Sequence, residues 1–178
     1  MTIEKIILGG GCFWCVESVF LQVRGVEAVV SGYMGGHEEN PSYQSVCTGM
    51  SGHAEVVAIN YDSEQISLRE LLMIFFALHD PTSLNRQGND VGTQYRSVIF
   101  YADDAEKQLA EEVIADVHQQ GVYQSEIVTT LEPLARFYPA EEYHQNYFAK
   151  NPSNAYCQFS ILPKREKLMA NFSEYVKA

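Results

Sequence analysis

The sequence contains few cysteines, fewer basic than acidic residues, and no long apolar run. Only 4 of its 178 residues are cysteine, which is too few for a disulfide scaffold and favours reduced thiols in a cytoplasm. With 12 Lys and Arg against 23 Asp and Glu, the net charge of −11 argues against nucleic acid and anionic membranes as partners. No stretch is long enough to span a bilayer, and Met1–Lys5 lacks the features expected of a secretory signal.

The chain is predicted to form a single domain over residues 1–178, because 46% of its residues are hydrophobic and no linker or repeat divides it. Apolar and alternating runs predict strands at residues 5–8, 26–33, 54–61, 97–101 and 127–131. Helical spacing of apolar residues predicts helices from residue 13, from residue 67 to 80, and at 103–120, 139–149 and 163–176. Residues 34–52 and 82–93 are predicted to be long polar loops.

The order of these elements, β-α-β-β-α-β-α-β, indicates the fold class. It predicts an α+β two-layer sandwich with a split-βαβ, ferredoxin-like core. We expect a mixed sheet with helices mainly on one face, followed by a long irregular C-terminal region that begins near residue 150.

Two of the cysteines lie in the segment Gly9–Cys15, between a predicted strand and a predicted helix. The glycine turn places Cys12 at or just before the first helical turn, where free backbone N–H groups and the helix dipole favour a thiolate. Cysteines are more often small buried residues, but this position favours a nucleophile. The Cys12–Cys15 pair also fits a thioredoxin-like dithiol. It fits half of a zinc site less well, because no second Cys or His pair has ligand spacing.

Further candidate residues lie in three polar segments. Glu55 begins an apolar strand and either faces solvent or faces a pocket near Cys12, where burial would raise its pKa by ~3–5 units and make it a general acid. His53 is interpreted as a structural histidine rather than a base. Tyr43 and Tyr95 lie in or beside the predicted loops, and their phenols near one thiol would form a polar cage.

A third group of candidates lies near the C-terminus. His144 and Tyr147 are three residues apart and share a predicted helix face. Tyr156 and Cys157 follow the break at Asn151 and Pro152. Together they form an aromatic and imidazole group next to a cysteine.

The sequence resembles the peptide methionine sulfoxide reductase A family from about Ile7 to Pro163. Each matching block is weak alone, but their number and order are specific. The blocks are Gly11–Trp14, Gly32–Tyr33, Gly35–Gly36, Asn40–Tyr43, Gly52–Glu55, Asn85–Asp90, Gly92–Ser97, Tyr138–Glu141, Tyr143–Gln145 and Tyr156–Cys157. The resemblance implies a thiol enzyme, with no metal and no organic cofactor, that repairs oxidative damage. It would reduce methionine-S-sulfoxide, free or in proteins, with thioredoxin as the reductant.

The resemblance also implies catalytic roles for individual residues. Cys12 would attack the sulfoxide sulfur, releasing methionine and leaving a sulfenic acid. Glu55 would protonate the sulfoxide oxygen, and Tyr43 and Tyr95 would donate hydrogen bonds to it. Asp90 would support the site through a hydrogen-bond network.

Substrate binding is implied for a second set of residues. Phe13 and Trp14 would form the apolar pocket for the ε-methyl group. His144, Tyr147 and Tyr156 would line the same basin. Because the methyl group can enter such a pocket in one orientation, the site would select one sulfoxide epimer.

The recycling cysteines depart from part of the family, in which glycine often stands at the position of Cys15. Cys157 is the first choice for the disulfide with Cys12, because it lies in a segment that we expect to be flexible. Cys15, one helical turn from Cys12, is the alternative, and Cys47 is interpreted as structural. Two other functions remain open: a thioredoxin-like oxidoreductase that uses Cys12 and Cys15, and a non-catalytic module that binds methionine-like side chains.

Overall fold

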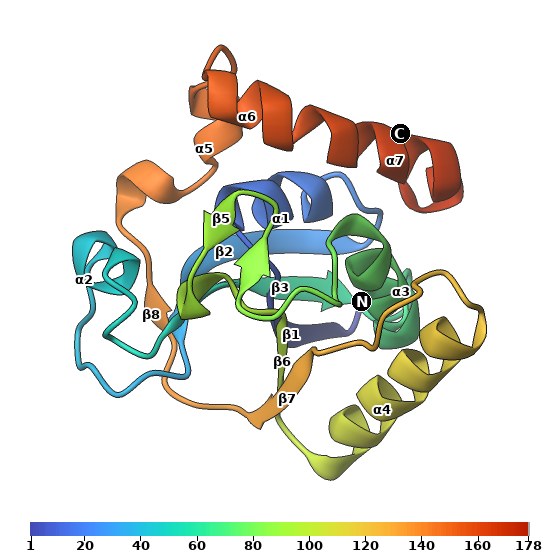
Figure 1. Cartoon of the computed structure of the whole chain (residues 1–178). Coiled ribbons are helices and arrows are strands. Elements are labelled where there is room, and N and C mark those ends of the chain that lie inside the picture. Colours follow the sequence, from blue (N-terminus) through green and yellow to red (C-terminus); the bar gives the residue numbers. More distant parts are fainter. Residues whose placement is uncertain (178) are drawn as a thin grey trace.

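The computed structural model of the chain describes residues 1–177 and contains a six-stranded sheet in the order β7-β6-β1-β3-β2-β8 (Figure 1). Every neighbouring pair is antiparallel except β6 and β7, which run parallel, so the predicted mixed sheet is confirmed. The strands are β1 (Ile3–Gly9), β2 (Val26–Met34), β3 (Ala54–Asp62), β6 (Val98–Tyr101), β7 (Thr130–Pro133) and β8 (Tyr138–Pro139).

Strand β3 lies between β1 and β2, the two strands that α1 (Phe13–Phe20) connects. Helices α1, α3 (Leu68–Leu78) and α4 (Asp104–Gln119) contribute to one large core against the sheet. The buried cluster on the other face consists of strand residues, with Phe137 packed against it. The α+β class and the placement of helices mainly on one face are therefore confirmed.

Local sequence accounts for the first half of the fold. Ser67 and Glu70 form the predicted capping box at the start of α3, and Gly121 follows α4 at φ +69, a left-handed conformation that suits glycine. The two predicted loops contain short elements that the sequence pattern did not predict. These are α2 (Tyr43–Cys47), the hairpin of β4 (Arg86–Gln87) and β5 (Asp90–Val91), and the 3-10 turn η1 (Thr93–Tyr95).

The predicted helix at 139–149 is wrong. The chain instead forms β8, the 3-10 turn η2 (Glu142–His144) and the short α5 (Tyr147–Lys150). Asn146 adopts the left-handed conformation at φ 53, which interrupts any continuous helix. The Gln145 side chain is also bonded to the backbone of β2, and this bond holds the segment against the sheet.

The remaining C-terminal elements are more regular than expected. The strand predicted at 127–131 begins three residues later, as β7. The region predicted to be irregular contains α6 (Ala155–Ser160), and the terminal helix is α7 (Leu162–Asn171), followed by η3 (Ser173–Tyr175). Helices α6 and α7 lie across α1 and close over the start of that helix (Figure 1).

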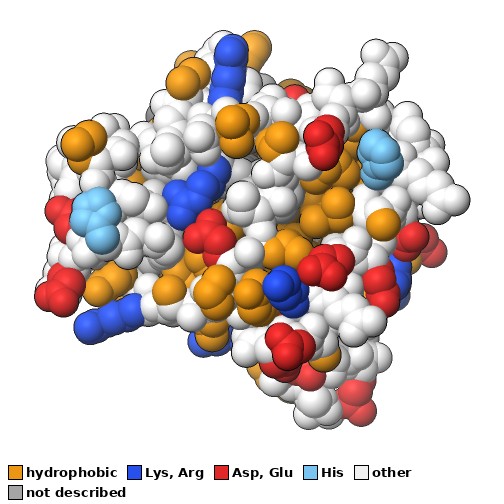
Figure 2. Space-filling view, turned by 60° about the horizontal axis from the view of Figure 1, so that its bottom comes forward, with side chains coloured by type: hydrophobic (Ala, Val, Ile, Leu, Met, Phe, Trp, Pro, Cys, Tyr) orange, Lys and Arg blue, Asp and Glu red, His pale blue; other side chains and the backbone are white. Residues whose placement is uncertain are grey.

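The negative charge is not gathered into one patch on the face shown in Figure 2, where Asp and Glu side chains are scattered among apolar and basic ones. Within residues 1–177, no helix combines the length and apolar character needed to cross a membrane. The prediction of one domain includes Ala178, which lies outside the described residues.

Candidate active site

Cys12 is the residue that precedes α1, and its backbone is extended at φ −63 and ψ 128. Its carbonyl accepts a hydrogen bond from the N–H of Cys15 at 3.1 Å, which closes the first turn. Gly11 has φ +89, and a Cβ there would lie 2.8 Å from Cγ of Gln87. The glycine therefore allows α1 to begin in close contact with the segment that leads to Asp90.

The helix start was expected to favour a thiolate at Cys12, but the pKa of Cys12 is shifted in the opposite direction. Burial, the hydrogen bond to Cys15 and the charge of Glu55 together raise the pKa of Cys12 well above its ordinary value. The N–H of Trp14 acts in the opposite direction, but its effect is smaller. The hydrogen bond from Cys12 in turn lowers the pKa of Cys15. These shifts favour a Cys12 thiol that donates to Cys15, because the loss of hydration outweighs the field at the helix N-terminus.

Glu55 lies on β3 directly beneath the start of α1. It is 1% exposed, and its Oε1 accepts a hydrogen bond from the N–H of Phe13 at 3.1 Å. Burial raises the pKa of Glu55 to about 8, against the opposing effect of the Phe13 N–H. The solvent-facing interpretation of Glu55 is therefore wrong. Glu55 is instead a buried carboxyl group that contacts the N–H of Phe13, the residue after Cys12, and its raised pKa favours the protonated form at neutral pH.

Tyr43 and Tyr95 approach this carboxyl group from two different turns. Tyr43 begins α2, and its N–H donates to Glu141 Oε2 at 2.9 Å. Tyr95 ends η1, and its carbonyl accepts from the N–H of Gly11 at 3.2 Å. Burial raises the pKa of both phenols, and the charge of Glu55 contributes to each. Both phenols therefore favour the protonated form, and the Tyr43 side chain also shares a hydrogen bond with Cys47.

Asp90 and Tyr156 lie on the other side of Cys12. The hydroxyl of Tyr156 donates to Oδ2 of Asp90 at 2.5 Å, which joins β5 to α6. A cleft of about 330 Å³ opens here, and its lining includes Cys12, Cys15, Asp90, Tyr156 and Lys164. The two thiols therefore line a cleft between the β4–β5 hairpin and the C-terminal helices.

The predicted aromatic basin is a continuous wall. Nε1 of Trp14 donates to Nδ1 of His144 at 3.0 Å, and the Tyr147 ring stacks on the indole with centroids 3.7 Å apart. Phe13 is buried, with its ring 5.3 Å from that of His144 and 6.5 Å from that of Tyr43. The indole is thus fixed by a hydrogen bond at its edge and by a ring on its face.

Three further residues, for which no role was predicted, connect α1 and the 141–145 segment, which carry much of this wall, to β2. The Gln145 amide bonds to both the N–H and the carbonyl of Ser31, at 3.0 and 2.9 Å. Glu17, which is 2% exposed, accepts from the Ser31 hydroxyl at 3.1 Å. Glu141 accepts from the Tyr33 hydroxyl at 2.9 Å. One signal was present for Glu17, because it is the only charged residue of α1 and lies four residues after Phe13.

The cysteines occupy positions that differ from those expected. Cys157 is fully buried in α6, and its N–H donates to Oδ1 of Asn154 at 3.1 Å, so its segment is an ordered, capped helix. Cys15, 4% exposed, and Cys157 belong to one buried cluster against which Cys12 packs. Cys47, which we interpreted as structural, is exposed at the end of α2.

Comparisons with known proteins agree with this arrangement. A family model described as "Peptide methionine sulfoxide reductase" matches residues 4–176. The chain is 56% identical over 176 residues to "Peptide methionine sulfoxide reductase MsrA" of Trichodesmium erythraeum (strain IMS101), covering 99% of each. It resembles the structure of Mxr1 from Saccharomyces cerevisiae in reduced form, with a TM-score of 0.80, 38% identity and coverage of 85% of this chain and 87% of that one. For Mxr1 in complex with Trx2, the TM-score is 0.57 at 26% identity, with coverage of 82% and 84%.

Proposed function

The chain belongs to the peptide methionine sulfoxide reductase family, and on this premise we propose that it reduces methionine-S-sulfoxide, free or in proteins, to methionine. The observation that carries the proposal is the buried Glu55 carboxyl group, held 3.1 Å from the backbone nitrogen that follows Cys12. With a pKa of about 8, this group is neutral at pH 7 and can give a proton to a sulfoxide oxygen.

In the first step, the Cys12 sulfur attacks the sulfoxide sulfur while Glu55 protonates the departing oxygen. The S–O bond of the substrate breaks as the protonated oxygen bonds to the Cys12 sulfur, so methionine is released and Cys12 is oxidised to a sulfenic acid, while the thiol proton of Cys12 returns to Glu55. Tyr43 and Tyr95 donate hydrogen bonds to the oxygen as it gains negative charge. Ionised Glu55 raises the pKa of Cys12, so a neutral Glu55 also makes the attacking thiolate easier to form.

The remaining site residues bind the substrate or hold the residues that bind it. Phe13 and Trp14 contact the methyl group, and His144, Tyr147 and Tyr156 complete the wall around it. Asp90 holds the Tyr156 hydroxyl at the edge of the cleft. The Trp14 indole is held by its hydrogen bond to His144 and by stacking with Tyr147, so the wall is rigid. A rigid wall supports selection of one epimer.

In the second step, we propose that Cys15 rather than Cys157 attacks the sulfenic acid, releasing water and forming a disulfide with Cys12. Cys15 is already hydrogen-bonded to Cys12, and its lowered pKa favours the attacking thiolate. Cys157 packs against Cys15 within the same cluster, so it is placed for a later exchange with that sulfur. This proposal reverses the order of preference drawn from the sequence, because the segment around Cys157 is helical and buried.

Thioredoxin is the proposed final reductant. The related Mxr1 was solved in complex with Trx2, and the Cys12–Cys15 pair lines an open cleft. The four cysteines are free thiols, which supports a reducing cytoplasm as the location. We also propose that residues 1–178 act as one catalytic domain.

The function is tested by incubating the protein with racemic methionine sulfoxide and dithiothreitol and then resolving the remaining epimers. We expect loss of the S epimer with an equal gain of methionine, while the R epimer stays at the level of a control without protein. Loss of neither epimer would contradict the proposal. Rapid reduction of insulin disulfides without sulfoxide turnover would favour the thioredoxin-like oxidoreductase. Saturable binding of methionine without turnover would favour a binding module.

The resolving thiol is tested with Cys15→Ser, Cys157→Ser and the exposed-site control Cys47→Ser. We expect Cys15→Ser to lose turnover supported by thioredoxin, because its Cys12 sulfenic acid has no adjacent thiol. It should keep turnover supported by dithiothreitol, and should still form one methionine per protein without reductant. Cys47→Ser should behave as wild type in each assay. If Cys157→Ser loses thioredoxin-supported turnover and Cys15→Ser keeps it, the proposed order is wrong.

A further inference from the structure

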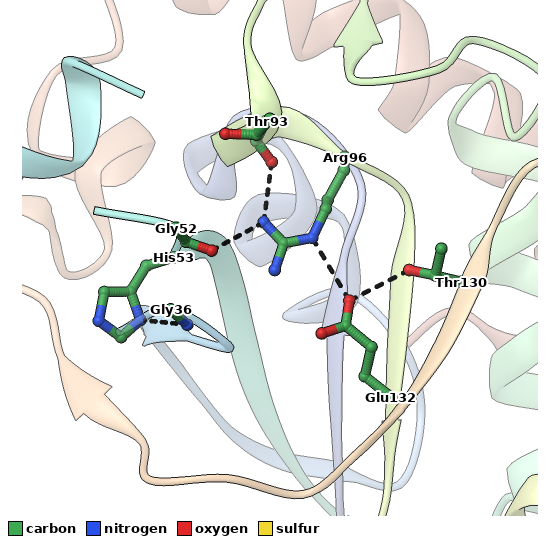
Figure 3. A network of polar contacts seen from close by, with 7 residues as sticks. All are labelled: Gly36, Gly52, His53, Thr93, Arg96, Thr130 and Glu132. Carbon is green, nitrogen blue, oxygen red and sulfur yellow. Dashed lines mark hydrogen bonds and ion pairs between the residues drawn. The ribbon is translucent and has the colours of Figure 1, made fainter. Parts of the chain in front are cut away.

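Arg96 connects the segment that leads into β3, the strand of the proposed acid, with the turn that ends at one of the proposed phenols (Figure 3). Its Nη1 donates to the carbonyl of Gly52 at 3.2 Å and to the carbonyl of Thr93 at 3.0 Å. Gly52 comes three residues before Glu55, and Thr93 begins the turn that ends at Tyr95. We propose that Arg96 is a positioning residue, which sets the placement of Glu55 relative to Tyr95.

The guanidinium is anchored to the sheet on its other side. Its Nε lies 3.4 Å from Oε2 of Glu132, which also accepts from the Thr130 hydroxyl at 3.2 Å. Both partners are on β7, which is paired with β6, the strand that begins shortly after Arg96. The Arg96 side chain is 15% exposed, so solvent competes little for these bonds. Arg96 therefore connects these two backbone segments to strand β7 as well.

The backbone around the guanidinium leaves space for a flat, branched cation. A Cβ on Gly35, which has φ +92, would lie 2.9 Å from Nη2 of Arg96. A Cβ on Gly36 would lie 2.3 Å from the backbone nitrogen of His53. The ring nitrogen Nδ1 of His53 accepts a hydrogen bond from the Gly36 N–H at 3.0 Å. Arginine can donate to two carbonyls and a carboxylate at once from fixed directions, whereas the single ammonium of lysine cannot match that geometry.

Arg96 affects the reaction because it positions Glu55 and Tyr95 relative to each other. Glu55 and Tyr95 act on the same sulfoxide oxygen, and a misplacement near 1 Å of a catalytic group can cost up to about 100-fold in rate. Within residues 1–177, Arg96 makes no hydrogen bond or ion pair with Cys12 or the aromatic wall, so it acts through the two backbone segments that it joins. The role assigned to Arg96 rests on the proposed function.

The test compares Arg96→Ala, Arg96→Lys and the control Arg69→Ala. Arg69 is a matched control because it also makes two ion pairs, to Glu112 and Asp116, but on α3 and α4. We expect Arg96→Ala to lower kcat for the S epimer roughly 10- to 100-fold, with KM changed much less. Arg96→Lys should recover part of kcat. Arg69→Ala should keep wild-type kcat and KM.

Two further measurements separate positioning from unfolding. Alkylation of Cys12 by iodoacetamide at pH 7, below the pKa of Glu55, should proceed at the wild-type rate in Arg96→Ala, because Cys12 is held by α1. Amide hydrogen exchange should accelerate at residues 52–55 and 93–95 and should not change in β1. The proposal is overturned if kcat is unchanged, if only KM changes, if alkylation falls with activity, or if exchange is unchanged. A wild-type protein that reduces no sulfoxide would contradict the proposed function instead, and the exchange result would still test the role of Arg96.

Discussion

Replacing Cys12 by serine is expected to reduce methionine formation to the level seen with reductant alone, with either thioredoxin or dithiothreitol. A serine hydroxyl is a weak nucleophile toward sulfoxide sulfur and cannot accept its oxygen to form a sulfenic acid. The substitution should not impair folding, because serine is a preferred residue at a helix N-cap and Cys12 makes no side-chain cap bond. Consumption of the S epimer and the thermal midpoint are the two measurements.

Cys47→Ser is the matched control for this variant. Cys47 is an exposed thiol at the end of α2 that shares a hydrogen bond with the Tyr43 side chain, and a serine hydroxyl can keep this bond, so the substitution should leave epimer consumption unchanged. Substantial methionine formation by Cys12→Ser would remove Cys12 from the first step and would leave Cys15 as the candidate nucleophile. A large fall in the thermal midpoint of Cys12→Ser would contradict the description of Cys12 as an N-cap residue whose side chain makes no capping hydrogen bond.

The parts of the fold that sequence predicted are those in which local pattern and tertiary structure agree. Strands β1, β2, β3 and β6 and helices α1, α3 and α4 follow from apolar periodicity and from caps such as Ser67. The segment 139–149 has a helical pattern, but its conformation is decided by bonds to a distant strand. Gln145 pairs with Ser31, 114 residues away, and no local pattern encodes that contact.

The candidate site shows the same division. Sequence patterns placed Cys12 at a helix start and Glu55 at a strand start, and the resemblance linked the two. The pairing of β1 with β3 then brings the two residues together. The predicted direction of the pKa change at Cys12 was wrong. The prediction used the helix start, which the local sequence shows, whereas the burial and the charge that raise the pKa come from neighbouring elements. Arg96 had no assigned role because two of its partners are backbone carbonyls, which leave no mark in a sequence.

Replacing Glu55 by glutamine is expected to lower the rate of the first turnover roughly 100- to 10,000-fold, the range typical of a lost general acid. Glutamine keeps the size of the side chain, and its amide oxygen can still accept from the Phe13 N–H, so the start of α1 should be preserved. The measurement is methionine formed per protein in a rapid-mixing experiment without reductant. Glu4→Gln is the control. Like Glu55, Glu4 is a strand carboxylate that accepts one hydrogen bond, in this case from the Tyr61 hydroxyl, but it is exposed on β1.

The pH dependence of the first turnover distinguishes an acid from a group that only fills space. In the wild type, Glu55 loses its proton as the pH rises through about 8, so its contribution as an acid is present below that pH and lost above it. Its carboxylate then also opposes ionisation of Cys12, whose pKa it raises. Glu55→Gln carries no such charge, so its low rate should not fall above pH 8. Its Cys12 thiolate, followed by ultraviolet absorbance, should form at lower pH than in the wild type. A wild-type rate that rises steadily through this range would contradict the role of Glu55 as the acid, because the proton it must donate would already be gone.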